Sequence, residues 1–309
     1  MKKMTGQLQG GVWSAAPTPW TLKGDLDRES IKRMVDHHLA LDVKGLFLAG
    51  TNGEGPWMTA RQRRGLVHDV VARVRGRIPI AVQVTDNSAA RILENMREVR
   101  EDGADVAVIA PPFFMYNVTP AHVLSLYLEA IRSSPLPVGI YDRGRSGAVF
   151  VPDAVMKALC LESKVVMLKD SSVSPERMRQ ALAVKRQRSG LILLNGNEFD
   201  CVSYLRAGYD GLLLGGGVFN GILARHIVDA MQQGDIKTAE QVQKRMNQLM
   251  WTVYGGKRIR FWLAGEKQLL KDMGVFSTTV NYPRYEVGAA GQRAIQRVLA
   301  KNRSVLLPT

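Results

Sequence analysis

Short apolar runs recur along the chain, and most of them are followed by a segment with helical periodicity. The runs occupy residues 11–19, 45–54, 78–86, 104–112, 136–142, 164–172, 190–198 and 209–217. Runs this continuously apolar are typical of strands that are buried on both faces of a parallel sheet. The pattern therefore predicts eight strands with helices between them.

The intervening segments carry helix-start signals. Residues 59–74 begin with Thr59 as a predicted N-cap, and residues 174–187 begin with Ser174 followed by Pro175. Serine and threonine are favoured at the N-cap, and proline is favoured at the first helical position. Both segments are predicted to be helices that follow strands.

Eight strands alternating with helices predict an α/β fold, a (β/α)8 TIM barrel. An open doubly wound sheet is the alternative, but a regular count of eight is what closure requires. The strand-like runs stop after residue 225. We expect residues 1–225 to form the barrel and residues 226–309 to form a C-terminal helical extension that packs on it.

Composition and charge place the chain among soluble globular proteins. Hydrophobic residues make up 46% and charged residues 23% of its 309 positions. The net charge of +14 would suit a nucleic-acid partner. The basic residues are scattered, however, and interleave with apolar ones at helical spacing, as on solvated helix faces. We therefore expect no nucleic-acid partner and a field that favours small anions.

The location is inferred from what the sequence contains. It has no apolar run of 18 residues, so no membrane span or membrane partner is predicted. The basic N-terminus has no apolar segment behind it, unlike a signal peptide. Cys160 and Cys201 are too few for a disulfide framework. A cytoplasmic location is expected.

The stretch "KVVMLKDSS", residues 164–172, ends an apolar strand with Lys169. In a barrel the active site lies at the carboxyl ends of the strands. Desolvation there lowers the pKa of a lysine, and a neutral amine can attack a ketone to form a Schiff base. The alternative is a lysine that reaches water or pairs with Glu54 or Asp170.

Two further strand ends carry polar groups. Tyr141 ends the neighbouring run, where its phenol could shuttle a proton or its ring could merely pack on the rim. In "GTNGEG", residues 50–55, the amides of Asn52 and Gly53 could hold a carboxylate. The same glycines would also suit a plain strand-to-helix turn.

Taken together, these motifs resemble the dihydrodipicolinate synthase and N-acetylneuraminate lyase superfamily of pyruvate-type class I aldolases. The family pattern "G-[ST]-[ST]-G-E" is similar to residues 50–54, "Y-N-x-P-x-R-[ST]-G" to residues 141–147, and "K-[DE]-[ST]-[ST]" to residues 169–172. The resemblance covers about residues 10–290.

The resemblance implies roles for matching residues. Lys169 would form the Schiff base, Tyr141 would donate and accept a proton, and Thr51 would pass the proton on. The amides of Asn52 and Gly53 would bind the carboxylate of a 2-oxo acid such as pyruvate. The implied enzyme is a lyase, acting by aldol cleavage, condensation or dehydration, without a metal or organic cofactor.

The second substrate would be an aldehyde or a sugar acid, met by Arg145. The family pattern is broken here: the loop carrying Arg145 is one residue shorter, and Asn52 replaces a Ser or Thr. The synthase of lysine biosynthesis borrows a tyrosine across a subunit interface, where this chain has Phe114. Tyr116 is the nearest replacement. We therefore expect retained Schiff-base chemistry with a different partner, not the lysine-pathway synthase itself.

The sequence leaves two alternative functions open, and the resemblance adds an expected assembly. Gly215 and Gly216 end the eighth run, where many barrels bind phosphate, so a phosphorylated substrate is one alternative. A non-catalytic binding or regulatory homologue is the other. The resemblance also implies a homo-oligomer, a tetramer, in which the aromatic loop after the fourth strand contacts a neighbour.

Overall fold

The computed structural model describes residues 8–308, and its strands form one closed parallel barrel. Each strand pairs with the next in sequence, and β8 closes the barrel against β1. The predicted TIM barrel is therefore confirmed, and the open sheet is excluded. The strands are β1 (Gly11–Ala15), β2 (Gly45–Leu48), β3 (Ile80–Gln83), β4 (Val106–Ile109), β5 (Val138–Asp142), β6 (Val165–Asp170), β7 (Ile192–Asn195) and β8 (Gly211–Leu214).

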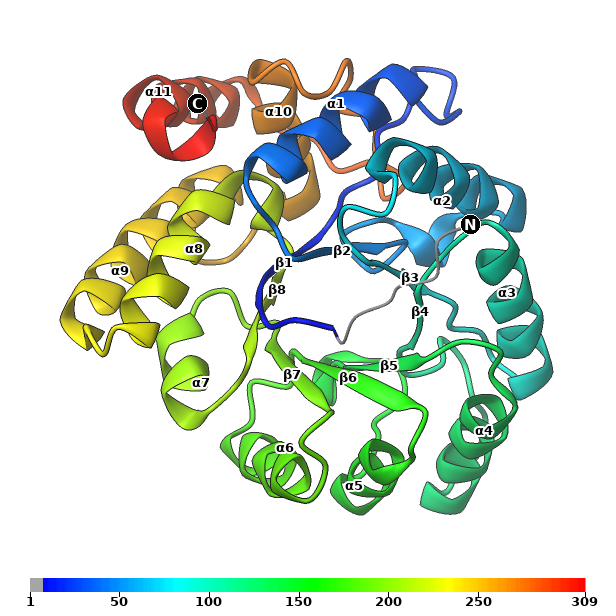
Figure 1. Ribbon diagram of the computed structural model, residues 1–309. Helices are drawn as coiled ribbons and strands as arrows, with labels where there is room; N and C mark the ends of the chain where they lie inside the picture. The colour runs from blue at the N-terminus through cyan, green and yellow to red at the C-terminus, as the bar shows by residue number, and fades with distance from the viewer. Residues whose placement is uncertain (1–7, 309) are drawn as a thin grey trace.

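Helices surround the strands, as Figure 1 shows in a view along the barrel. Thr59 caps α2, and Ser174 caps α6 ahead of Pro175, as predicted. The helices are α1 (Arg28–Ala40), α2 (Ala60–Val74), α3 (Ala89–Glu101), α4 (Pro120–Ser133), α5 (Asp153–Leu161), α6 (Pro175–Gln187), α7 (Cys201–Ala207), α8 (Gly217–Gln232), α9 (Ile236–Val253), α10 (Trp262–Asp272) and α11 (Ala289–Leu306), with short 3-10 turns η1 (Gly55–Trp57) and η2 (Gly144–Ser146). Among residues 8–308, every helix is too short or too polar to cross a bilayer.

Alternation along the strands sorts side chains between two apolar cores. One face of each strand packs against the surrounding helices, and the other fills the barrel interior. The interior is therefore packed with side chains, and polar groups gather only where the strands end. The buried interior residues are Trp13, Ala15, Phe47, Ala81, Val106, Val108, Ala110, Tyr141, Met167, Ile192, Leu194 and Leu213.

A bulge in β6 decides which way its last residues point. Val138 of β5 pairs with Val165, but the next residue of β5, Gly139, pairs with Met167. The extra residue shifts the alternation, so Val165 packs outward while Met167 lies inside the barrel. Lys169, two residues after Met167, consequently points inward at the strand's carboxyl end.

The last three helices lie beside the barrel, next to α8 and α1 in Figure 1. The helix α8 spans residue 225, and the domain division expected there stays a prediction. Contact with the barrel includes a fully buried ion pair between Lys267 of α10 and Glu54, just after β2. The C-terminal helices thus reach the end of the barrel where the strands finish.

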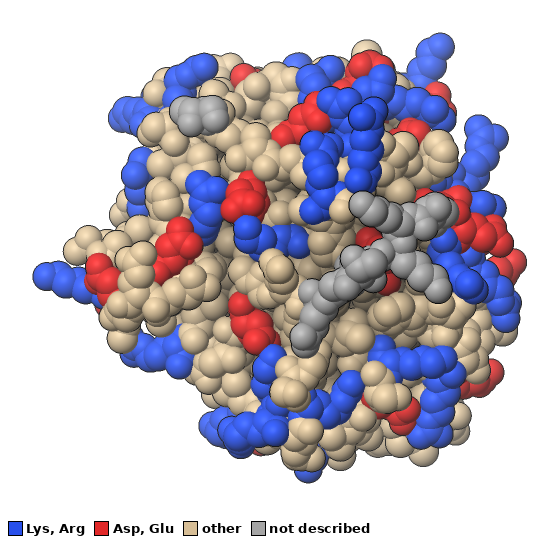
Figure 2. Space-filling model, in the orientation of Figure 1, with Lys and Arg blue, Asp and Glu red and all other residues tan. Residues whose placement is uncertain are grey.

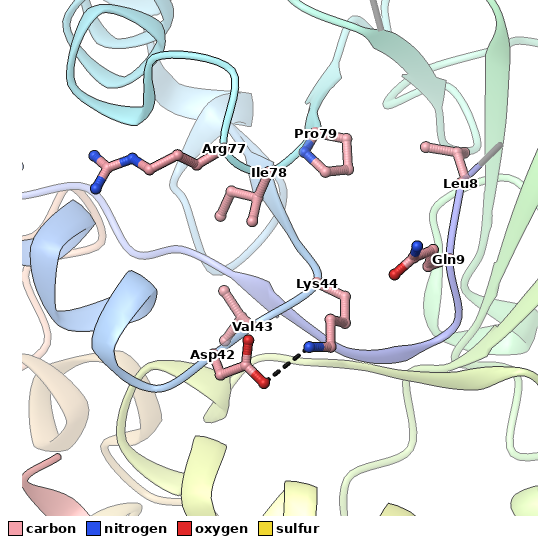
Figure 3. Close-up of a pocket in the computed structure, with 8 residues that line it drawn as sticks. All are labelled: Leu8, Gln9, Asp42, Val43, Lys44, Arg77, Ile78 and Pro79. Carbon is pink, nitrogen blue, oxygen red and sulfur yellow. Dashed lines mark hydrogen bonds and ion pairs between the residues drawn. The ribbon is translucent and has the colours of Figure 1, made fainter. Parts of the chain in front are cut away.

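Basic side chains are spread over the face seen in Figure 2 and alternate with acidic ones. Figure 3 shows a hollow of about 290 Å³ at the amino ends of β2 and β3. Its one charge pair joins Lys44 to Asp42 at 2.8 Å. This hollow lies at the opposite end of the barrel from the carboxyl ends of the strands, where TIM-barrel active sites form.

Candidate active site

Lys169 and Tyr141 lie side by side at the carboxyl ends of β6 and β5. They are register partners, and Lys169 Nζ is 4.2 Å from the centre of the Tyr141 ring and 5.1 Å from that of Phe47. Only 5% of Lys169 and 6% of Tyr141 is exposed. The structure therefore brings the two predicted residues together in an aromatic, water-poor corner of the barrel.

Burial and neighbouring charges shift the pKa of both groups. Burial lowers the pKa of Lys169, and the Arg143 guanidinium adds to this, although Tyr141 and Glu198 act in the opposite direction. Burial works to raise the pKa of Tyr141, but the charges of Lys169 and Arg143 outweigh it and hold that pKa below its usual value. The pair is therefore suited to exchange protons nearer neutral pH than either isolated group.

Tyr141 also has hydroxyl neighbours. Interactions of the phenol with the side chains of Thr51, after β2, and Ser171, after β6, help to lower its pKa. Thr51 was predicted from the family pattern, whereas Ser171 was not singled out. The predicted role of Thr51 in passing on the phenol proton stays a prediction.

The turn after β2 presents backbone donors. Among residues 8–308, no protein hydrogen bond occupies the N–H of Asn52 or Gly53. A Cβ on Gly53 would lie 2.9 Å from the Ala16 carbonyl oxygen and 2.8 Å from Ala49 N, so only glycine fits. Thr18 Oγ1 donates to the Gly53 carbonyl at 2.7 Å and fixes the peptide. Two buried N–H groups without a protein acceptor can donate hydrogen bonds to an anion such as a carboxylate.

The Asn52 side chain does not share this role. Its Nδ2 lies 2.8 Å from the Ala15 carbonyl oxygen, 3.1 Å from that of Gly215 and 2.9 Å from Glu266 Oε1. The amide donors are therefore used within the protein. The side chain ties the turn to β1, β8 and α10 in place of the hydroxyl that the family pattern has there.

Glu198, after β7, faces the same space. Gly216 N donates to its Oε2 at 2.7 Å, and a Cβ on Gly215 would lie 3.7 Å from that oxygen and 3.8 Å from Asn52 Oδ1. Burial raises the pKa of Glu198, against the Gly216 N–H and the Lys169 charge. The two glycines after β8 thus border the Glu198 carboxyl group, an arrangement that opposes phosphate and suits ligand hydroxyls.

Arg145 lies apart from Lys169. It is exposed in η2, with its guanidinium carbon 5.0 Å from the centre of the Phe150 ring, and it lines a cavity of about 420 Å³ beside the start of α6. Arg143, two residues earlier, is the arginine whose charge acts on Lys169 and Tyr141. Arg143 and Glu198 were not among the predicted site residues, although Arg143 directly follows one predicted strand and Glu198 ends another.

Val173, beside the same cavity, has a strained backbone. Its φ is +54° and its side chain is 65% exposed. A left-handed conformation costs a residue with a Cβ about 1–2 kcal/mol, and a β-branched one is a clear outlier.

Replacing Val173 with glycine should therefore raise the free energy of unfolding by about 1 kcal/mol, since glycine adopts positive φ freely but loses more entropy on folding. Urea denaturation measures the gain. Val173→Ala, which keeps a Cβ at positive φ, is the control and should gain less. Equal stability of the glycine variant and the wild type would mean that this loop stores no strain.

The loop after β4 exposes three aromatic side chains. Phe113 is 40%, Phe114 67% and Tyr116 82% exposed. Exposed apolar groups gathered in one loop are typical of contact surfaces. The expected tetramer, and any role of Tyr116 as a replacement for a borrowed tyrosine, stay predictions.

Comparison with known proteins agrees with the fold and the motifs. Residues 8–302 match the model of the dihydrodipicolinate synthetase family. The 4-hydroxy-tetrahydrodipicolinate synthase of Kosmotoga olearia is 28% identical over 79% of this chain and 83% of its own. The probable 2-dehydro-3-deoxy-D-pentonate aldolase YjhH of Escherichia coli is 28% identical over 73% of this chain and 75% of its own.

A solved structure supports the same fold. YagE of Escherichia coli K12, a prophage protein of the dihydrodipicolinic acid synthase family determined in complex with pyruvate, superimposes with a TM-score of 0.85 at 21% identity. It covers 94% of this chain and 98% of that one. Family members are lyases and aldolases that act on small molecules. On the match across nearly its whole length, this chain belongs to the dihydrodipicolinate synthetase family.

Proposed function

We propose that the protein is a class I lyase in which Lys169 forms a Schiff base with a 2-oxo acid, pyruvate or a sugar-acid derivative that contains it. The observation that carries the proposal is the buried Lys169 amine against the Tyr141 ring, at 4.2 Å from its centre. A lysine whose pKa is lowered by burial has a larger fraction of neutral, nucleophilic amine.

The first step joins enzyme and substrate. The neutral Lys169 amine attacks the keto carbon, and the carbonyl oxygen takes a proton from Tyr141 to give a carbinolamine. A proton moves from the amine nitrogen to this hydroxyl, which leaves as water, so that a protonated imine and the Tyr141 phenolate remain. The carboxylate of the 2-oxo acid rests on the free N–H groups of Asn52 and Gly53.

Cleavage then uses the imine as an electron sink. Tyr141, now a phenolate, removes the proton from the hydroxyl at C4, the C3–C4 bond breaks, and its electron pair moves into the imine to give an enamine. The aldehyde leaves. Protonation of the enamine at C3 and hydrolysis of the imine release the shorter 2-oxo acid and regenerate the amine. Condensation is the reverse of this sequence.

For the second substrate we propose a hydroxylated aldehyde or sugar acid. Glu198 offers an acceptor for a ligand hydroxyl, and the Gly216 N–H that a phosphate would need already binds Glu198. The relative YjhH, a probable 2-dehydro-3-deoxy-D-pentonate aldolase, is consistent with this class. Phe114 cannot supply the relay hydroxyl of the lysine-pathway synthase, so we propose a different partner from that enzyme.

The test is borohydride reduction in the presence of pyruvate, followed by peptide mass analysis. Irreversible labelling of Lys169 is expected, and label elsewhere, or none with any 2-oxo acid, would refute the mechanism. Turnover is then measured with pyruvate and a panel of aldehydes. Hydroxyaldehydes should react faster than aspartate semialdehyde and faster than phosphorylated aldehydes. Labelling without turnover on the whole panel would indicate a non-catalytic homologue.

Tyr141→Phe should lower turnover by about 10²-fold, the lower end of the range for a lost acid–base group, because the Thr51 and Ser171 hydroxyls remain. Folding should be unaffected, since one hydroxyl is removed from a packed ring. Steady-state kinetics on the best panel substrate measure the effect. Tyr204→Phe, on α7, is the matched control, and a Tyr141→Phe rate within a few-fold of wild type would make Tyr141 a packing residue.

A further inference from the structure

Glu266 is a buried carboxyl group of the C-terminal helices that contacts the turn with the free N–H groups. It lies on α10, is fully buried, and accepts a hydrogen bond from Asn52 at 2.9 Å. The next residue, Lys267, forms the buried ion pair with Glu54 at the far end of the same turn. Two consecutive residues of α10 therefore hold this turn at two points.

The orientation of the Asn52 amide is fixed by its surroundings. Its Nδ2 faces oxygen atoms of Ala15, Gly215 and Glu266. Reversing the amide would place Oδ1 against the Ala15 and Gly215 carbonyl oxygens, which can only accept, and would lose both of those bonds. The Asn52 amide nitrogen Nδ2 is therefore the donor to Glu266 Oε1.

Two atoms of this contact are left without a partner among residues 8–308. They are Asn52 Oδ1 and Glu266 Oε2, both buried. A buried acceptor without a donor is costly. Both atoms belong to side chains that are already joined through their other atoms. A proton on Glu266 Oε2 would supply the donor that Asn52 Oδ1 lacks and would complete a two-bond pair between a neutral acid and an amide.

The charges around Glu266 agree with a neutral acid. Burial raises the pKa of Glu266 well above its usual value, against the hydrogen bond from Asn52, and Glu198 and Glu54 act in the same direction as burial. Lys267 acts in the opposite direction, but its ammonium already binds Glu54 and the carbonyl oxygens of residues 18 and 280.

We propose that Glu266 is a positioning residue, which as a neutral acid paired with Asn52 holds the turn so that the Asn52 and Gly53 N–H groups face the carboxylate of the 2-oxo acid. This inference rests on the proposed function, because it takes that carboxylate as the ligand of the turn. It assigns to the C-terminal helices a part in binding the substrate. Affinity for the 2-oxo acid, not the chemical step at Lys169, should depend on Glu266.

The experiment compares Glu266→Gln with Glu266→Met in the full chain. Borohydride trapping of Lys169 over a series of pyruvate concentrations gives a half-saturating concentration and a limiting rate. Glutamine supplies an N–H where the acid has its O–H, so both values should stay within about twofold of wild type. Methionine has no donor or acceptor for the amide, so its half-saturating concentration should rise by about 10-fold to 10²-fold, with the limiting rate nearly unchanged.

Gln268→Leu is the matched control, since it removes a side-chain hydrogen bond on the same helix, to Asp272, without touching the turn. If Glu266→Gln raised the half-saturating pyruvate concentration tenfold, or changed the pH dependence of trapping, Glu266 would not be a neutral acid. An unchanged methionine variant would overturn the positioning role. If the methionine variant does not fold, Asn52→Ala releases the same contact from the other side, and an unchanged value there is equally decisive.

Failure of the proposed function would look different. In that case pyruvate and borohydride would not label Lys169 in the wild-type protein at all. Normal labelling of the wild type with identical saturation in every folded variant would instead refute only the role of Glu266.

Discussion

Replacing Lys169 with methionine should abolish labelling by pyruvate and borohydride and lower turnover by about 10³-fold or more. Removal of a covalent nucleophile is among the most damaging single changes in an enzyme. Methionine matches the length of the buried stem and packs well against Phe47 and Tyr141, so the barrel should fold. Mass analysis of the trapped protein and steady-state rates provide the two measurements.

Lys157→Met, on the exposed side of α5, is the matched control and should label like wild type. Wild-type trapping should also depend on pH in a defined way. Because the pKa of Lys169 is lowered, the trapping rate should rise with pH and level off below the usual lysine value of about 10.4. A Lys169→Met variant that still turns over at more than a tenth of the wild-type rate would remove the Schiff base from the mechanism.

The barrel could be predicted because its signal is repeated. Eight apolar runs, each buried on both faces, leave few arrangements other than a closed parallel sheet. The runs were longer than the strands, since "GLFLAGTNGE" at 45–54 contains β2 (Gly45–Leu48) and the whole following turn. The predicted strand boundaries are therefore least accurate at the carboxyl ends of the strands. The site residues lie there, and hydrophobic periodicity does not mark where a strand ends.

The direction of Lys169 could not be read from its strand. In a run that is apolar on both faces, alternation does not show which residues face the interior. The bulge at the start of β6 sets that choice, and it arises from pairing with Val138 and Gly139 of another strand. The sequence therefore predicted the position of the lysine along the chain but not the shift that turns it inward.

Contacts between residues far apart in the sequence could likewise not be predicted. Glu266 meets Asn52 across 214 positions of sequence, and Arg143 acts on Lys169 where the family pattern suggested Arg145. Both differences trace to this chain's own departures, the asparagine in the turn and the shortened loop after β5. A residue pattern transferred from a family is least informative where the chain departs from that family.

Replacing Lys267 with methionine should lower the free energy of unfolding by about 3–5 kcal/mol, because it breaks the buried ion pair with Glu54. Lys267→Met leaves the Glu54 carboxylate fully buried, where only the Trp20 indole and the Tyr282 N–H still donate to it. Removing one partner of a buried pair leaves an uncompensated charge, which costs far more than a surface pair does. Urea denaturation gives the loss, with Lys271→Met on the exposed part of the same helix as control.

The sign of the pH dependence shows whether the loss of stability comes from the unpaired Glu54 charge or from lost packing of the Lys267 stem. Without Lys267, the buried Glu54 carboxylate has no opposite charge beside it, a cost that is present only while the carboxyl is ionised. Acid neutralises carboxyl groups and therefore relieves this cost. Lys267→Met should therefore be less destabilised at pH 5 than at pH 8, relative to wild type.

Adding Glu54→Gln to Lys267→Met removes the unpaired charge, so the double variant should regain part of the lost stability at pH 8. A loss that is equal at both pH values, with no recovery in the double variant, would show that Lys267 contributes through the packing of its stem and not through its charge.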